Sequence, residues 1–213
     1  MFTLSPSDFA FLWRDCRRCY WRKVVLGRPR PSGGLPGVFT TIDRLMKQWH
    51  ADGGARRLAP NAPWSRLMGT DLRLQSRAIT IDGLATGAVI DGRADAVVQW
   101  EDAAFGVIDY KTSGSGARAI GRYTEQLHGY AYAAERAAPR ARTFVPVTRL
   151  ALLVFEPTSF TDADDGVQLG GRLAWHEIPR DMPRFEGFLR EVLTVLNGAE
   201  PAPREGCAFC TPP

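Results

Sequence analysis

The sequence predicts an α/β fold in which a central mixed β-sheet is flanked by helices. Apolar residues recur at helical spacing near both ends of the chain, whereas apolar and polar residues alternate through much of the middle. The predicted order is helices, a meander of strands, a helix, further strands and a helix, which is typical of a sheet covered by helices. At 213 residues the chain is about one and a half times the usual domain length, so we expect a single elaborated domain over 1–213.

Composition narrows the class of protein. The chain is 45% hydrophobic, 10% aromatic and 23% charged, which excludes disordered, collagen-like and coiled-coil proteins. The longest apolar run, Leu150–Phe155, is far shorter than the roughly 18 residues of a membrane-spanning helix. The first residues lack a basic segment followed by an apolar stretch and a cleavage site, so we expect no membrane partner and a cytoplasmic location.

Two helices are expected before the strands. The first begins at Ser5, because a serine cap is followed by a proline at the first helical position and by Asp8. A loop rich in proline and glycine spans Arg28–Gly37, and the second helix ends at Asp52–Gly54. The predicted apolar face of that second helix comprises Val38, Ile42, Leu45, Met46 and Trp49.

Strand patterns begin at about Thr70 and continue beyond the middle of the chain. Leu72–Ile81 fits one or two strands, and Gly92–Trp100 with Ala104–Lys111 fits a hairpin. A flexible loop at Thr112–Gly116 then precedes a helix over Arg122–Ala138.

The last third of the chain adds two strands and a helix. The strands are expected over Arg149–Phe155 and Arg172–Ile178. Asp181 is a suitable cap for the final helix, and Asn197–Gly198 ends it. The apolar face of this helix comprises Phe185, Phe188, Leu189, Val192, Leu193 and Leu196.

All four cysteines occur in two pairs of identical spacing, Cys16/Cys19 and Cys207/Cys210. A reducing cytoplasm disfavours disulfides, whereas two C-x-x-C pairs supply four soft ligands for zinc or an iron–sulfur cluster. Unrelated free cysteines or a redox pair are the alternative. A shared metal would tie the ends of the chain together, with 1–36 and 198–213 forming a cap at the cysteine site.

Basic residues concentrate in the segment from Trp13 to Arg30, although the whole chain carries a net charge of only +4. Asp15 is the one acid of this segment, and Tyr20 and Trp21 are interleaved with the basic side chains. The mixture suits contact with a nucleic-acid backbone, and a solvated helix face is the alternative. The basic residues are Arg14, Arg17, Arg18, Arg22, Lys23, Arg28 and Arg30.

The predicted hairpin carries a group of charged residues. Asp109 and Lys111 are two apart on a covered strand and therefore share one face, and Asp95 on the preceding strand can lie opposite Asp109. Two adjacent carboxylates repel unless a cation lies between them, and hard oxygen ligands suit magnesium or manganese. Lys111 can orient an attacking water and neutralise charge on a phosphate. A plain salt bridge between Asp109 and Lys111 is the alternative.

Gln126 and Tyr130 lie four apart on the helix that follows. They share a face, one turn apart, and offer an amide, a ring and a hydroxyl to a phosphate or an unpaired base. A partly buried tyrosine and a surface glutamine are the alternative.

In order, the motifs G-R-A-D-A-V, V-I-D-Y-K-T and Q-L-H-G-Y resemble those of the PD-(D/E)XK nuclease superfamily. The resemblance is to the RecB-type branch that includes CRISPR-associated adaptation exonucleases with iron–sulfur clusters. It implies a restriction-endonuclease-like core in which Asp95, Asp109 and the Tyr110 carbonyl bind Mg²⁺ or Mn²⁺. It also implies that Lys111 is the catalytic lysine and that Gln126 and Tyr130 form the Q-x-x-x-Y motif.

The resemblance further implies a [4Fe–4S] cluster held by Cys16, Cys19, Cys207 and Cys210. The cysteines are divided two and two between the ends of the chain, whereas the family usually has one and three. Zn²⁺ therefore remains the alternative to the cluster. The branch also places a metal-binding histidine in a G-x-x-x-H setting, but Gly37–Asp43 contains no histidine. Asp43 can substitute as an oxygen ligand, and His50 is two turns further along.

The expected function is therefore that of a metal-dependent DNA nuclease, with exonuclease activity on ends or single strands. DNA is expected over RNA, and the chain can work with protein partners in a repair or defence complex. One alternative is a nuclease fold without catalysis that binds nucleic acid or serves in assembly. The other is a structural zinc module, which would have no affinity for DNA.

Overall fold

The computed structural model describes residues 1–31, 34, 36–112 and 117–210. Its centre is a seven-stranded sheet in the order β2-β3-β4-β5-β6-β7, with β1 paired to β4. The pairs β1/β4 and β5/β6 are parallel and the other pairs are antiparallel, so the predicted mixed sheet is confirmed. The strands are β1 Phe2–Leu4, β2 Arg56–Arg57, β3 Trp64–Gln75, β4 Ala88–Trp100, β5 Phe105–Thr112, β6 Val147–Ala163 and β7 Gly166–Ile178.

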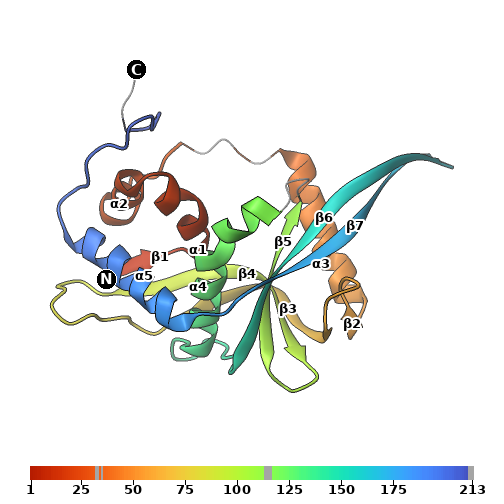
Figure 1. Ribbon diagram of the computed structural model, residues 1–213, viewed down its shortest axis with the longest axis horizontal. Helices are drawn as coiled ribbons and strands as arrows, with labels where there is room; N and C mark the ends of the chain where they lie inside the picture. The colour runs from red at the N-terminus through yellow and green to blue at the C-terminus, as the bar shows by residue number, and fades with distance from the viewer. Residues whose placement is uncertain (32–33, 35, 113–116, 211–213) are drawn as a thin grey trace.

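Helices cover both faces of the sheet (Figure 1). Apolar residues of α2, α4 and α5 join one core with Val107 of β5, whereas Met46 of α3 joins a second core with Ile108 and Tyr110. Among the described residues, no helix is both long and apolar enough to cross a bilayer. The helices are α1 Pro6–Asp8, a π-helix Phe9–Trp13, α2 Arg17–Leu26, α3 Gly37–Asp52, a 3-10 helix Ala117–Tyr123, α4 Thr124–Glu135 and α5 Met182–Asn197.

The final helix matches its prediction closely. The Asp181 side chain caps it by accepting the Arg184 N–H at 3.0 Å, and Gly198 follows its last residue. Its predicted apolar face packs into the first core. A strong cap and an unbroken apolar stripe agree here, which is why the sequence located this helix well.

The exposed and buried faces of α3 differ from the prediction. Val38, Leu45 and Trp49 are exposed, although they were expected on the buried face, whereas Met46 and His50 are buried. The helix has apolar residues on two sides, and periodicity alone cannot say which side meets a sheet. On the buried side of α3, Met46 packs in the second core, and the neighbouring Lys47 contacts Asp71 and Asp95 of the sheet.

The strands β3, β6 and β7 also differ from their predictions. Strand β3 begins at Trp64 and ends at Gln75, so the strand expected to reach Ile81 ends earlier. A register shift at Leu67/Gly69, where Gly69 has φ of 157°, interrupts the alternation that marks a strand in sequence. Of the loop predicted at 112–116, all but the first residue lies outside the described ranges.

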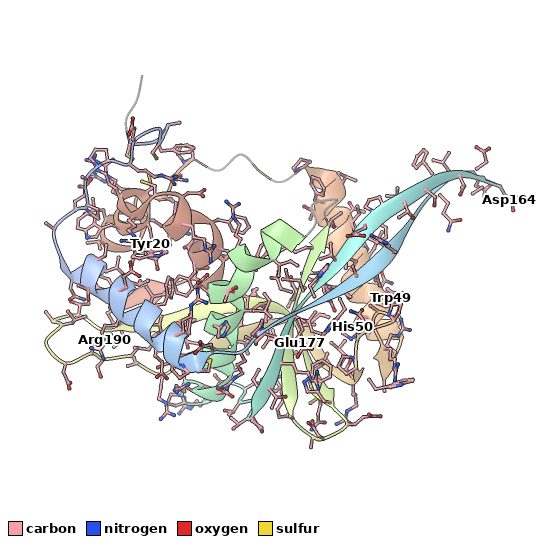
Figure 2. All side chains as sticks on the ribbon, viewed as in Figure 1. Tyr20, Trp49, His50, Asp164, Glu177 and Arg190 are labelled. Carbon is pink, nitrogen blue, oxygen red and sulfur yellow. The ribbon has the colours of Figure 1, made fainter. Side chains whose placement is uncertain are left out.

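Strands β6 and β7 continue past their predicted limits as a two-stranded arm over residues 156–172 (Figure 1). Asp164 lies at its tip (Figure 2). Phe160, Val167 and Leu169 are exposed on it. The register of the pair shifts between Pro157 and Ser159, and polar residues and glycines outnumber apolar residues beyond that point.

His50 links α3 to the sheet beneath it. It is fully buried, and its Nδ1 hydrogen-bonds to the Tyr110 hydroxyl. Burial lowers the pKa of His50 to about 4, with a smaller effect in the same direction from Arg56. The histidine is therefore neutral at pH 7.

This burial predicts a loss of stability in acid. Between pH 6.5 and 4 the unfolded chain protonates His50 while the folded protein does not, so the free energy of unfolding should fall by on the order of 2–3 kcal/mol as the pH drops. In His50→Asn, which keeps a polar atom near Tyr110, that part of the slope should disappear. Denaturant unfolding at several pH values measures it, and equal slopes for both proteins would contradict the assignment.

Candidate active site and cysteine cluster

Asp95 and Asp109 come together where β4 and β5 separate. The last paired residues of this ladder are Ala96 and Ile108. Beyond them, the N–H of Tyr110 donates to Asp95 Oδ2 at 2.8 Å, so a side-chain oxygen takes the place of a backbone carbonyl of the neighbouring strand as the acceptor. The hairpin and the apposition of the two carboxylates agree with the strand pattern. We call this point, where the two strands part around Asp95 and Asp109, the fork.

Asp109 is the most strongly perturbed carboxyl of the fork. It is 3% exposed, and its Oδ2 lies 2.5 Å from Lys111 Nζ. Burial raises the pKa of Asp109 to about 7, because the nearby ammonium lowers it by less and Asp95 raises it further. Burial by itself would lower the pKa of Lys111, but Asp109 and Asp95 hold it above its usual value. Lys111 is therefore a cation held against a buried carboxyl whose ionised form it compensates only in part.

Gln126 and Tyr130 reach the fork from α4. Both are buried, and Gln126 Nε2 donates to Asp109 Oδ1 at 2.7 Å. The alternative of a surface glutamine is therefore wrong. A Cβ on Gly92 of β4 would lie 2.7 Å from Pro6 Cδ and 3.1 Å from the Tyr130 ring, so the glycine permits the close approach of both residues to the sheet.

A cleft of about 600 Å³ opens at the fork. Its lining includes Asp43 of α3 and the predicted residues of β4, β5 and α4. Three aromatic residues that the sequence analysis did not select, Phe11, Phe39 and Tyr123, also line it. Phe39 lies one helical turn before Asp43, which is the signal that could have identified it. The predicted residues that line the cleft are Asp43, Asp95, Asp109, Tyr110, Lys111, Gln126 and Tyr130.

Lys47 is a further charged residue that the sequence analysis missed. Its Nζ lies 2.8 Å from Asp43 Oδ2, 2.8 Å from Asp71 Oδ1 and 3.1 Å from Asp95 Oδ1. Asp43 and Lys47 are four residues apart on α3 and point toward the sheet. An acid–lysine pair at this spacing usually marks a solvated face, so the sequence offered no reason to select it.

The oxygen atoms at the fork fit a hard divalent cation. Asp95 and Asp109 supply carboxylates, and the Tyr110 carbonyl belongs to the same strand end. The raised pKa of Asp109 supports this fit, because it identifies a buried carboxyl whose ionised form lacks full compensation.

The four cysteines converge as their spacing predicted. All four Sγ atoms lie within 4.8 Å of one another, with Cys16–Cys210 at 3.5 Å and Cys19–Cys207 at 3.7 Å. One tetrahedral ion with bonds of about 2.3 Å sets sulfur atoms about 3.8 Å apart, so this spacing fits a single ion. A four-iron cluster would require the sulfurs to stand further apart.

The basic N-terminal segment is tied to acids of the chain itself. Arg17 pairs with Glu191 of α5, and both Arg18 and Arg22 pair with Glu200. These ion pairs hold α2 against the C-terminal part of the chain, beside the cysteines (Figure 1). The remaining pairs are Arg14–Glu125, Lys23–Asp8 and Arg30–Asp15.

This arrangement predicts that metal binding at the cysteines stabilises the fold. A shared ion closes the chain between residues 19 and 207, which removes roughly 5 kcal/mol of unfolded-state entropy. Cys207→Ser should therefore lower the free energy of unfolding by about that amount and reduce the bound metal. Phe209→Ala, which leaves every sulfur in place, is the control. Equal stability of the Cys207→Ser and wild-type proteins would contradict the prediction.

Comparison with known proteins adds two findings. The family model described as the PD-(D/E)XK nuclease superfamily matches residues 5–211. A crystal structure of SSO0001 is similar with a TM-score of 0.52 and 19% sequence identity, covering 98% of this chain and 82% of that chain, which shows a likeness of fold. No curated protein matches the chain.

Proposed function

The chain belongs to the PD-(D/E)XK nuclease superfamily, and from this premise we propose that it is a metal-dependent DNA nuclease acting at the fork. The observation that carries the proposal is the convergence of Asp95, Asp109, Lys111 and Gln126 in one cleft. Members of this superfamily are usually metal-dependent nucleases.

Asp95, Asp109 and the Tyr110 carbonyl are the proposed ligands of Mg²⁺ or Mn²⁺. When bound, the cation supplies Lewis-acid activation and charge stabilisation for phosphodiester hydrolysis. The other contributions come from the chain itself. Lys111, which is an ammonium here, orients the attacking water and stabilises negative charge on the phosphate rather than removing a proton.

Gln126 fixes the Asp109 carboxylate through its 2.7 Å hydrogen bond, so we assign it a positioning role. Its Oε1 is buried and has no hydrogen-bond partner among the described residues. Tyr130 lies one turn along α4 on the same side and lines the cleft with it. We propose that these two residues orient the scissile strand.

Aromatic rings at the cleft support a preference for single strands or ends. Phe11, Phe39 and Tyr123 offer faces on which unpaired bases can stack. Lys111 Nζ lies 4.8 Å from the Tyr123 ring centroid, which places one of these rings beside the proposed catalytic lysine. Exonuclease or flap-type cleavage of DNA is therefore the specific activity that we propose.

The direct test is cleavage of end-labelled single- and double-stranded DNA in the presence of Mn²⁺, with RNA of the same sequence in parallel. Asp109→Asn and Lys111→Met should each lower the cleavage rate by about a thousandfold, equivalent to about 4 kcal/mol of lost transition-state stabilisation. Cleavage by either variant at the wild-type rate would refute the assigned site.

Matched control variants make the same change of charge at residues outside the fork. Asp91→Asn alters a β4 carboxylate that pairs with Arg73, and Lys23→Met alters a lysine that pairs with Asp8. Both should cleave as the wild type does. Salt-sensitive DNA binding without any cleavage would instead favour the second candidate, a nuclease fold that binds nucleic acid or serves in assembly.

For the cysteine site we propose a metal centre held by all four sulfurs, and the [4Fe–4S] cluster that the resemblance to iron–sulfur nucleases implies is the first candidate for it. The sulfur spacing favours the second candidate, Zn²⁺. Iron and zinc analysis of anaerobically purified protein separates the two. About four irons and a brown colour would identify the cluster, whereas one zinc would identify the single ion.

A further inference from the structure

Lys47 lies at the centre of a charge cluster that the proposed mechanism does not use. Its ammonium is within 3.1 Å of oxygen atoms from three aspartates, Asp43, Asp71 and Asp95. Those aspartates belong to α3, β3 and β4, so three separate elements converge on one nitrogen. The Lys47 side chain is 14% exposed. An ordinary surface ion pair joins two solvent-exposed groups, whereas here one largely buried ammonium contacts three carboxylates.

The backbone holds two of these carboxylates beside each other. Asp71 lies between the β3 residues Thr70 and Leu72, which pair with Ala96 and Ala94 on either side of Asp95. Like charges on adjacent strands are destabilising unless a cation compensates them. Asp71 also has a φ of 50°, a left-handed conformation that costs energy in a non-glycine residue.

The compensation comes from Lys47. Three carboxylate oxygens, one each from Asp43, Asp71 and Asp95, lie about 3 Å from its ammonium. Three convergent carboxylates are also the donor set that binds a hard divalent ion.

Resting on the proposed metal-dependent nuclease, we propose that the Lys47 ammonium takes the place of a second divalent ion beside Asp95, so that the cleft binds one divalent ion per chain. Asp95 would serve both cations: its Oδ1 lies 3.1 Å from Lys47 Nζ, and its carboxylate would also hold the ion at Asp109. Asp43, expected from the sequence as a substitute ligand for the absent histidine, holds Lys47 instead. Lys47 is a positioning residue in this arrangement.

The test is the number of Mn²⁺ ions that the full chain binds. Calorimetric titration of the wild type should give one ion per chain at the fork, and Lys47→Met should give two. Lys47→Arg, which keeps a cation at this position, and Lys23→Met, which removes a distant lysine, should each give one. Electron paramagnetic resonance gives a second readout, because two neighbouring Mn²⁺ ions in Lys47→Met should couple magnetically, whereas the wild type should show an isolated ion.

Each outcome decides the inference. Two ions in the wild type, or only one in Lys47→Met, would overturn it while leaving the proposed metal-dependent function in place. Absence of Mn²⁺ binding by both proteins would overturn the inference and the proposed metal site together. If Lys47→Met is unfolded without metal, Mn²⁺ should restore its folding, and failure to do so would also overturn the inference.

Discussion

Buried negative charge at the fork is the constraint on which the rest of the site depends. Asp95 and Asp109 lie where β4 and β5 separate, and Asp109 is almost inaccessible to water. Such charges are stable only beside cations or hydrogen-bond donors. The fold supplies Lys111 from the same strand, Gln126 from α4 and Lys47 from α3. Helices on both faces of the sheet therefore supply groups that compensate the buried charge of the fork.

The cysteine cluster brings together two segments from near the opposite ends of the chain. Four sulfurs and the ion pairs from Arg17, Arg18 and Arg22 hold α2 against the C-terminal segment. The π-helix before α2 contributes Phe11 to the cleft, so the N-terminal region also shapes the site. Three of the basic residues that the sequence suggested for nucleic-acid contact are therefore paired with acids of the chain itself.

A feature of the structure could be predicted from the sequence where its signal lay in residues close together in the chain. The α5 cap, the β4–β5 hairpin and the paired cysteines each carry their signal in adjacent residues, and these predictions agree with the structure. Lys47 and Asp71 have no such signal, because their importance arises from convergence of α3, β3 and β4. The buried side of α3 and the arm of β6 and β7 were missed for the same reason, since tertiary packing overrides periodicity. Motif order located the cleft, but only the fold could show which charges compensate one another.

The oxygen atoms at the fork are the proposed divalent-cation site. The most direct measurement is a crystal structure of the protein soaked in Mn²⁺, with anomalous scattering used to locate manganese. We expect a manganese peak within coordination distance of Asp95, Asp109 and the Tyr110 carbonyl, with Lys47 still paired to Asp43. A fully soaked crystal without manganese at these three residues would contradict it.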